Sequence, residues 1–397
     1  MRLATPDWVA TPGGAALLAA LDAGAGTTRL VGGAVRDGLL GRAGSDVDLA
    51  TQLRPETVIA RLQAAGLKAV PTGLAHGTVT AVAAGLVAEV TTLRRDVATD
   101  GRHAEVAFTD DWQADASRRD FTINALYATL PGGDISDFFG GADDLAARRV
   151  RFIGDPLQRI AEDHLRILRF FRFSARYAEA LDGDGLAACT ARANDLMALS
   201  RERIALELRG LLAVADPLPV LAVMLAHGIW RPVLPEIAAE RLPVLARTLA
   251  AETASGLAPA WQRRLAALLP ADAKLAETVA ARLRLSNADR ARLALAVPPL
   301  GTGPVPENLR AQAWALGAEA VVDRLLVAGD AETAMTLAGW QRPRLPVAGR
   351  DVLARGFAAG PHIARILGRF ERLWVAAGFP DDPAAVTRLL DQAAVQE

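Results

Sequence analysis

Hydrophobic and polar residues alternate in short runs along the first third of the chain, a pattern typical of β-strands. Helix-like spacing, with apolar residues three and four apart, separates these runs at 35–40 and 55–65. The second helical segment opens on Pro55, and proline suits the first turn of a helix. We therefore expect an α/β or α+β unit over 28–155. The predicted strands are 28–31, 46–51, 78–83 and 86–92.

From residue 156 onward the pattern is helical throughout. Ala, Leu and Arg dominate, and the apolar residues recur at helical spacing. We expect about ten helices there. Since no fixed-period repeat is visible, an irregular helical stack is favoured over a regular solenoid. Breaks containing Pro, Gly or Asp are predicted at 182–185, 216–219, 231–235, 298–306 and 341–346.

Composition excludes several classes of protein. Apolar residues make up 51% of the 397 residues and charged residues 22%, which excludes bulk disorder. Lys and Arg number 44 against 45 Asp and Glu, so any contact with nucleic acid must come from local patches. The single Cys189 excludes a disulfide framework and Cys-based zinc or iron–sulfur sites. With no signal-peptide pattern and no apolar run of about 18–20 residues, we expect a soluble cytoplasmic protein without membrane contact.

A glycine turn and an acidic pair form the first candidate site. Gly32 and Gly33 end a predicted strand and lead into a helix that carries Arg36, which leaves backbone N–H groups exposed to an anion. Asp46 and Asp48 lie two apart on the next strand, so both carboxylates point to one face. A cation such as Mg²⁺, shared with substrate phosphates, would offset their repulsion. Either motif alone is also common in ordinary turns and capping sites, whereas their combination is more specific.

Two further clusters carry arginine. Arg118 and Arg119 adjoin an apolar run, where they either face solvent or meet a ribose or phosphate partner. Farther along, Asp163, Arg166, Arg169 and Arg172 form one stripe of a predicted helix over 160–173. This stripe is typical of an ordinary amphipathic helix with ion pairs, or of a site that recognises a base.

The second interpretation of the stripe is chemically specific. An arginine can donate to N3 and O2 of cytosine or to N1 of adenine. An ionised aspartate can only accept, from N4 of cytosine or N6 of adenine, and it would oppose O4 of uracil and O6 of guanine. Such a pair of contacts discriminates by about 1–3 kcal/mol. An Asp/Arg pair could therefore select C and A without a template.

Taken in order, these motifs resemble the signature of class II tRNA nucleotidyltransferases, which comprise the CCA-adding enzymes and the closely similar bacterial poly(A) polymerases. The resemblance is carried by residues 30–37 with Asp46 and Asp48, by 118–125 and by 162–169. The helix at 200–208 and the segments 346–353 and 360–363 are also similar to the family. The match covers 28–210 well and 345–375 fairly, whereas 211–344 match by helical character alone.

The resemblance implies a fold and a division of the chain. The implied α+β fold has a polymerase-beta-like nucleotidyltransferase head with a mixed sheet, followed by an elongated all-helical neck, body and tail. We expect the head at 1–155, a base-reading neck at 156–240, and an RNA-binding body and tail at 241–397. The polar segment 95–111 would be the mobile loop of the family.

The resemblance also implies a role for each motif residue. Asp46 and Asp48 would bind the catalytic Mg²⁺, and Glu89 is a further acidic candidate that could instead pair with Arg94. The residues expected to bind nucleotide fall into three groups: Gly32, Gly33 and Arg36 for the triphosphate, Arg119 for the ribose or phosphates, and Asp163 and Arg166 for the base, supported by Arg169 and Arg172.

The implied activity is template-independent addition of CCA to the 3′ end of tRNA, with CTP and ATP as substrates. Its partner would be the tRNA acceptor arm, and no DNA is expected. Since no His-Asp dipeptide occurs in the chain, the phosphohydrolase activity of some relatives is not expected. Two alternatives remain open, a poly(A) polymerase on the same fold and a non-catalytic RNA-binding protein built on it.

Overall fold

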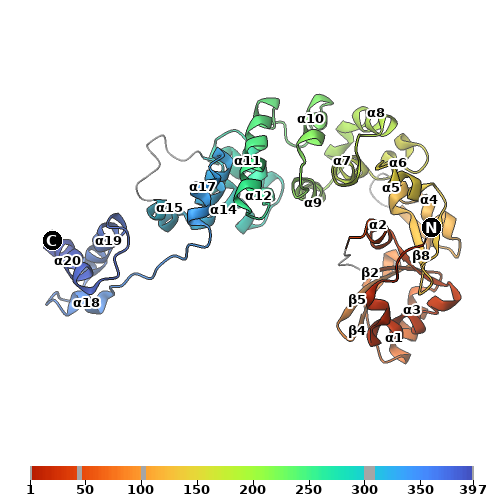
Figure 1. Ribbon diagram of the computed structural model, residues 1–397, viewed down its shortest axis with the longest axis horizontal. Coiled ribbons are helices and arrows are strands. Elements are labelled where there is room, and N and C mark those ends of the chain that lie inside the picture. The colour runs from red at the N-terminus through yellow and green to blue at the C-terminus, as the bar shows by residue number, and fades with distance from the viewer. Residues whose placement is uncertain (1, 43–46, 100–103, 299–308, 396–397) are drawn as a thin grey trace. The chain divides into compact units, whose positions relative to one another are not determined.

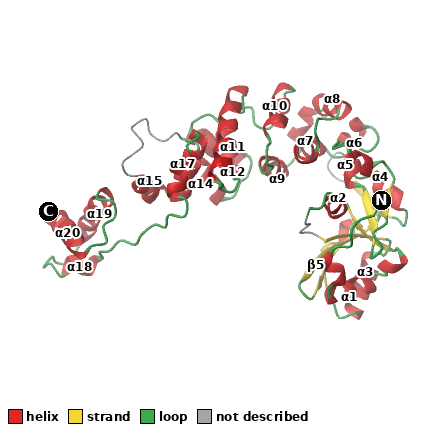
Figure 2. Ribbon diagram, viewed as in Figure 1, coloured by secondary structure: helices red, strands yellow, loops and turns green. Residues whose placement is uncertain are grey.

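The computed structural model describes residues 2–42, 47–99, 104–298 and 309–395 (Figure 1). Contacts within the chain divide it into two units, Met1–Val233 and Leu234–Glu397. All the described strands belong to the first unit, and the second is helical in its described parts (Figure 2). The finer division of the chain at 155 and 240 stays a prediction.

A seven-stranded mixed sheet forms the centre of the first unit. Its strand order is β3-β4-β5-β2-β1-β8-β9, in which β2 and β5 run parallel and the other neighbours antiparallel. The four predicted strands are present, and three shorter or more exposed ones were not foreseen. The strands are β1 Thr28–Val31, β2 Val47–Thr51, β3 Lys68–Gly73, β4 Thr78–Ala83, β5 Leu86–Thr92, β8 Leu126–Thr129 and β9 Ile135–Asp137.

The two faces of the sheet have separate cores because successive side chains of a strand point to opposite sides. Leu30 and Leu49 are opposite each other in register and pack with helices α1 (Pro12–Ala20) and α3 (Pro55–Ala64). Val31 and Ala50 belong to a second cluster around Tyr127. The second face also carries the residues of the site described below.

Residues 95–111 differ from the expected loop. They contain most of a hairpin, in which β6 (Arg94–Thr99) pairs antiparallel with β7 (Ala104–Phe108). These strands lack the alternation of apolar and polar residues by which the other strands were predicted. Strand pairing depends on backbone hydrogen bonds, which form whatever the side chains are.

The predicted helix over 160–173 is wrong as a single element. Helix α6 (Pro156–Glu162) ends before Asp163, whose backbone is extended at φ −151° and ψ 107°, and α7 (Arg166–Tyr177) begins three residues later. The Asp163 carboxylate accepts a hydrogen bond from the backbone N–H of Leu165 at 3.1 Å. Such a local bond competes with helix continuation, which is why aspartate favours helix starts over helix interiors.

Helices complete the first unit and form the second. The described parts beyond residue 155 hold fifteen α-helices, more than the ten or so expected, because helices also end at breaks that were not predicted, such as 163–165 between α6 and α7. The predicted break at 298–306 lies almost wholly outside the described residues. The remaining first-unit helices are α2 Gly33–Leu39, α4 Trp112–Ser117, α5 Gly141–Ala146, α8 Gly183–Ala191, α9 Arg201–Leu212 and α10 Leu218–Ala226. The second-unit helices are α11 Leu242–Ser255, α12 Trp261–Leu268, α13 Ala273–Arg282, α14 Asn287–Ala296, α15 Leu309–Leu316, α16 Ala318–Ala328, α17 Ala331–Leu337, α18 Gly349–Leu353, α19 Pro361–Ala376 and α20 Pro383–Val395.

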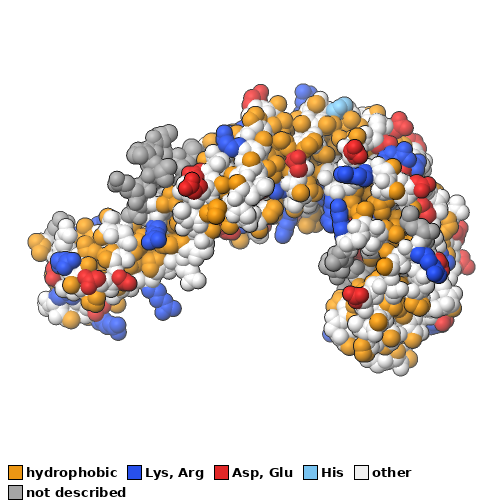
Figure 3. Space-filling view, in the orientation of Figure 1, with side chains coloured by type: hydrophobic (Ala, Val, Ile, Leu, Met, Phe, Trp, Pro, Cys, Tyr) orange, Lys and Arg blue, Asp and Glu red, His pale blue; other side chains and the backbone are white. Residues whose placement is uncertain are grey.

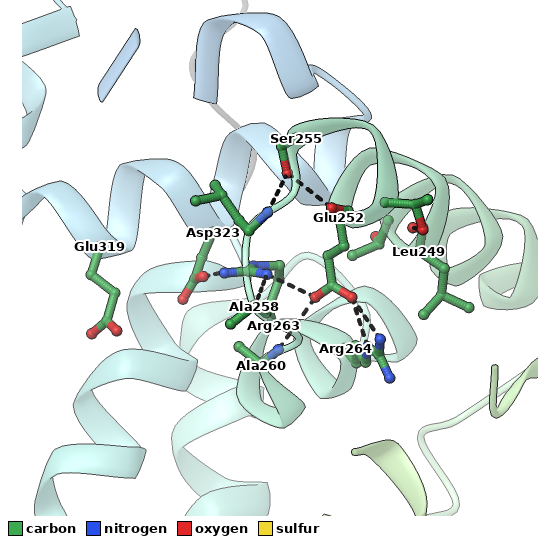
Figure 4. Close-up of polar contacts among 12 residues, drawn as sticks. Leu249, Glu252, Ser255, Ala258, Ala260, Arg263, Arg264, Glu319 and Asp323 are labelled. Atoms are coloured by element: carbon green, nitrogen blue, oxygen red, sulfur yellow. Dashed lines mark hydrogen bonds and ion pairs between the residues drawn. The ribbon is translucent and has the colours of Figure 1, made fainter. Parts of the chain in front are cut away.

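A buried ion network joins α11, α12 and α16 of the second unit (Figure 4). Arg263 donates to Asp323 at 2.8 Å and to Glu252 at 2.7 Å, and Arg264 donates to the other oxygen of Glu252 at 2.8 Å. All four side chains are at most 5% exposed. Each buried charge has a partner, as burial requires.

The surface carries both signs of charge. On the face drawn in Figure 3, Lys and Arg side chains are interspersed with Asp and Glu, in keeping with the near-zero net charge. Among the residues that the structure describes, we find no helix with the length and apolar character needed to cross a membrane.

Candidate active site

A cavity of about 810 Å³ opens in the first unit, between the sheet and the helices α2, α7 and α9. Every predicted site residue within the described ranges lines it, whereas Asp46 lies outside those ranges. The roles assigned to these residues stay predictions. The lining residues foreseen from the sequence are Gly32, Gly33, Arg36, Asp48, Arg119, Asp163, Arg166, Arg169 and Arg172.

Two carboxylates reach the cavity from neighbouring strands. Asp48 of β2 lies opposite Glu89 of β5 in the parallel register, and both residues line the cavity. Oxygen ligands of this kind suit a hard divalent cation. Within the described residues no group of three or more His, Cys, Asp or Glu side chains could hold a metal ion. The predicted metal site, Asp46 and Asp48 with Glu89 as a further candidate, stays a prediction, and Asp46 lies outside the described residues.

The glycine turn lies against two guanidinium groups. Gly32 has φ 62° and ψ −120°, a conformation that favours glycine, and it precedes the first residue of α2. A Cβ at Gly32 would lie 3.4 Å from Nη1 of Arg119, and one at Gly33 would lie 3.5 Å from Nη2 of Arg36. Backbone N–H groups and positive charge thus face the same part of the cavity, an arrangement that suits phosphate.

Arg36 is buried and held on three sides. Its Nε donates to Asp37 at 2.9 Å, its Nη1 donates to the side-chain oxygen of Asn124, and its guanidinium lies 4.2 Å from the centre of the Tyr177 ring. Burial would raise the pKa of the Asp37 carboxyl, but the bonds from Arg36 and Tyr177 outweigh it and lower that pKa. These contacts restrict the orientation of the Arg36 guanidinium.

Asp115 supports the Arg118–Arg119 pair, a role that the sequence analysis did not assign although the spacings of three and four residues are typical of helical ion pairs. It lies buried at 1% exposure and binds Arg118 at 2.8 Å and Arg119 at 3.0 Å, while the Tyr127 hydroxyl donates to it at 2.7 Å. Burial would raise the pKa of Asp115, yet the guanidinium groups of Arg119 and Arg118 hold it far below its usual range. Burial also raises the pKa of the Tyr127 phenol, so it stays a donor.

Two more carboxylates position the stripe of α7. Arg169 binds Asp120 at 2.6 Å, and Arg172 donates to Glu207 of α9 at 2.5 Å. Burial would raise the pKa of Asp120, but Arg169 and the amide of Asn124 lower it. Asp120 stands next to Arg119 in the sequence, whereas no spacing signal pointed from Arg172 to Glu207.

The predicted base-reading pair already has protein partners. Arg203 of α9 donates to Asp163 at 2.8 Å, and both side chains are about one-third exposed, at 37% and 30%. Arg166 donates to Glu162 at 2.7 Å and to the backbone carbonyl of Arg118 at 2.8 Å. Arg203 also lines the cavity, and sequence analysis assigned it no role.

Arginine is the commonest charged residue in the cavity lining. Its lining includes eight arginines and four carboxylates, and the arginines come from the sheet side as well as from α7 and α9. Four further carboxylates, Asp37, Asp115, Glu162 and Glu207, pair with these arginines from outside the lining. The guanidinium groups that face the cavity can donate hydrogen bonds to the oxygens of a polyphosphate. The cavity thus combines anion-binding groups, two sheet carboxylates and an Asp/Arg pair.

Known proteins share both the sequence and the fold. Residues 28–151 match the family described as "Poly A polymerase head domain", and 180–241 match "Probable RNA and SrmB- binding site of polymerase A". The mitochondrial CCA tRNA nucleotidyltransferase 1 of Danio rerio is 35% identical over 372 residues, covering 87% of this chain and 83% of the relative. The CCA-adding enzyme of Levilactobacillus brevis is 32% identical over 383 residues, covering 91% and 93%. The chain belongs to the CCA-adding enzyme family.

Solved structures agree with this membership. The crystal structure of the Bacillus stearothermophilus CCA-adding enzyme in complex with CTP has a TM-score of 0.72 and 27% identity, covering 97% of this chain and 99% of that one. The Thermotoga maritima CCA-adding enzyme complexed with tRNA, at 20% identity and a TM-score of 0.66, shows the common fold. The expected nucleotidyltransferase head with a mixed sheet, followed by helices, is confirmed, and the protein is a nucleotidyltransferase.

Proposed function

We propose that this CCA-adding enzyme family member adds C and A nucleotides to the 3′ end of tRNA from CTP and ATP, without a template and with release of pyrophosphate. Family membership supports this function. The observation that carries it is the single cavity that gathers the glycine turn, Asp48 and the Asp163/Arg166 pair.

The chain's own groups position the reactants and offset charge. We infer that the N–H groups of the glycine turn and Arg36 hold the triphosphate, while Arg119 contacts the ribose or phosphates. The tRNA 3′-hydroxyl attacks the α-phosphorus in line, the bond from that phosphorus to the bridging oxygen breaks, and pyrophosphate leaves. Fixed positive groups around the transferred phosphoryl stabilise the transition state with little reorganisation.

A divalent metal belongs to this proposal. Nucleotidyltransferases of this kind use divalent metal ions, and the carboxylate oxygens of Asp48 and Glu89 along one side of the cavity fit a hard cation. We infer that Asp48 and Asp46 would hold Mg²⁺, which when bound lowers the pKa of the attacking hydroxyl and offsets the charge of the triphosphate.

Base selection falls to Asp163 and Arg166 in this proposal. Cytosine and adenine each offer Asp163 an amino group and offer Arg166 a ring nitrogen, whereas uracil and guanine offer Asp163 an oxygen. Since Arg203 and Glu162 now engage these side chains, an incoming base would share or replace those partners. The cost of the exchange is small for Asp163, because its pair with Arg203 is partly solvated.

One assay tests the function and its alternatives. The full-length protein is given tRNA that lacks its last three residues, with CTP and ATP supplied separately and then together. We expect CTP to be incorporated first and ATP only after it. Incorporation of ATP alone into many RNA 3′ ends would instead identify a poly(A) polymerase, the activity that the name of the matched head domain indicates.

Absence of Mg²⁺-dependent pyrophosphate release with every RNA would overturn the enzymatic assignment and favour a non-catalytic RNA-binding protein. The cytoplasmic location stays a prediction, and the Danio rerio relative is mitochondrial by name.

A further inference from the structure

The arginine stripe of α7 continues beyond the nucleotide cavity. Arg166, Arg169 and Arg172 line that cavity, and Arg176 follows four residues later on the same side of the helix. Arg176 lines a second cavity, of about 330 Å³, together with Arg42. Both cavities lie within the first unit, and α2, α7 and α9 are labelled there in Figure 1.

The second cavity combines two cations with small neighbours. The side chain of Arg176 is 50% exposed, and Arg42 is also exposed. The rest of the lining is small or apolar and includes Ala175, Ala213 and Ala215. The lining that the structure describes contains no carboxylate.

Charge is unbalanced around the Tyr177 ring, which Arg42 and Arg176 of the second cavity both approach. The guanidinium groups of Arg36, Arg42 and Arg176 lie 4.2, 5.4 and 5.3 Å from the centre of the Tyr177 ring. Asp37 lies 2.9 Å from Arg36 but 3.9 Å from Arg176, and it also accepts a hydrogen bond from Tyr177. Among the described groups at this ring, three arginines therefore face one carboxylate, that of Asp37, which pairs most closely with Arg36.

The linings of the two cavities contact each other where α9 packs against α7. A Cβ at Gly210 would lie 2.6 Å from Cδ of Arg172, so the α9 backbone lies directly against this side chain. Arg172 lines the first cavity and Gly210 the second. A chain of phosphates that leaves the nucleotide cavity along α7 would thus meet Arg176 after one helical turn.

We propose that Arg42 and Arg176 bind a backbone phosphate of the RNA substrate close to its growing 3′ end. Arginine binds phosphate through two parallel hydrogen bonds, and such contacts position a nucleic acid without reading its sequence. The site rests on the proposed function, which supplies the RNA. The triphosphate of the incoming nucleotide already has its own groups at the glycine turn, so the second cavity takes the other phosphate-bearing substrate.

The test measures binding of tRNA lacking its last three residues, without nucleotide, over a range of salt concentrations. The variants are Arg42→Ala, Arg176→Ala and their combination. Ala213→Glu places a negative charge in the cavity without removing a cation. The matched control is Arg61→Ala, because Arg61 is 41% exposed and pairs with one aspartate, on a helix of the opposite face of the sheet.

We expect the double variant to weaken tRNA binding by roughly tenfold, and each single change to lower the slope of log affinity against log salt by about 0.7–0.9. The KM for ATP should stay unchanged, and Ala213→Glu should weaken tRNA binding while the fold stays intact by circular dichroism. Affinity and slope equal to those of Arg61→Ala would overturn the site. A raised KM for ATP with unchanged tRNA binding would assign the cavity to the nucleotide and also overturn it.

The same experiment separates this site from the activity. If the wild-type protein binds tRNA but incorporates neither CTP nor ATP, the proposed function fails. The salt slopes of the variants still decide whether Arg42 and Arg176 contact RNA phosphate.

Discussion

Single residues in the nucleotide cavity work in pairs, one facing the cavity and one behind it. Arg119 has Asp115 behind it, and Arg172 has Glu207. A buried carboxylate that loses its arginine, or the reverse, leaves an uncompensated charge that costs about 3–5 kcal/mol. The carboxylates therefore restrict the orientation of the arginines before any substrate arrives, which lowers the cost of binding.

The first residue-scale prediction concerns Asp48. We expect Asp48→Asn to lower the rate of CTP incorporation at least about 100-fold, because it removes a charged oxygen ligand beside the triphosphate. Thermal stability and tRNA affinity should match the wild type, since Asp48 is only half-buried. Single-turnover incorporation measures the effect, with Asp22→Asn, an exposed aspartate, as the control. Wild-type incorporation by Asp48→Asn would remove Asp48 from the metal site.

The second residue-scale prediction concerns base selection. We expect Arg166→Ala to lose about 1–3 kcal/mol of preference for CTP and ATP over UTP and GTP, because a donor to the base edge disappears. A competition assay with all four nucleotides measures the ratios. Arg61→Ala serves as the control, since it removes the same charge from an exposed position on the opposite face of the sheet. Unchanged ratios in Arg166→Ala would contradict the base-reading role.

At the scale of elements, the turn between α6 and α7 sets the direction of the Asp163 side chain relative to the arginines of α7. A continuous helix would place Asp163 and Arg166 one turn apart on one side. The extended backbone of Asp163 instead turns its carboxylate toward Arg203 of α9. The packing of α7 against α9 also brings Glu207 to Arg172, so these two helices share the support of the cavity.

The ion pair between Arg169 of α7 and Asp120 predicts that the free energy of unfolding depends on pH. The folded state lowers the pKa of Asp120 below its unfolded value of about 3.9. Its ionised form therefore stabilises the fold above about pH 4, and this contribution is lost as the pH falls through the lower, folded pKa. We expect Asp120→Asn to lower the free energy of unfolding at pH 7. Toward pH 3 the free energies of unfolding of variant and wild type should become similar.

Urea unfolding from pH 7 to pH 3 measures this difference, with the exposed Asp184→Asn as the control. A difference between wild type and Asp120→Asn that stays constant over this range would contradict the assignment of the stabilisation to the ionised carboxylate.

At the scale of the whole molecule, two units with separate cores share one chain. Separate cores favour separate unfolding transitions. The ion network in Figure 4 belongs to the second unit, whereas the nucleotide cavity belongs to the first. A substitution in the network should therefore lower the stability of the second unit and leave nucleotide binding by the first unit unchanged.

Asp323→Asn tests this separation. Asp323 is fully buried and binds both Arg263 and Arg292, so we expect the second unit to lose about 3–5 kcal/mol of stability. Calorimetry should show the unfolding transition of the second unit at a lower temperature than in the wild type, and CTP affinity should stay unchanged. The control is Glu319→Gln, an exposed partner of Arg292 that should cost less than about 1 kcal/mol. Loss of CTP binding in Asp323→Asn would contradict the independence of the units.

The amino-acid sequence by itself determined the local features of this protein. Alternation placed β1, β4 and β5, and the spacing of Gly32, Asp48 and the arginines of α7 identified the residues that line the cavity. These signals were readable because strand and helix periods relate residues only two to four positions apart. Order and spacing of the motifs then sufficed to indicate the family.

The tertiary structure alone decided which distant residues support that site. Asp163 and Arg203 are 40 residues apart and Arg172 and Glu207 are 35 apart, and no local period relates them. The hairpin of β6 and β7 and the turn at Asp163 are local features, which apolar periodicity does not reveal because they depend on backbone hydrogen bonds and a capping carboxylate. The ion pairs between distant residues follow from how the helices pack. A buried charge is costly unless it is paired, and only the packed fold decides which oppositely charged side chain lies close enough to pair with it.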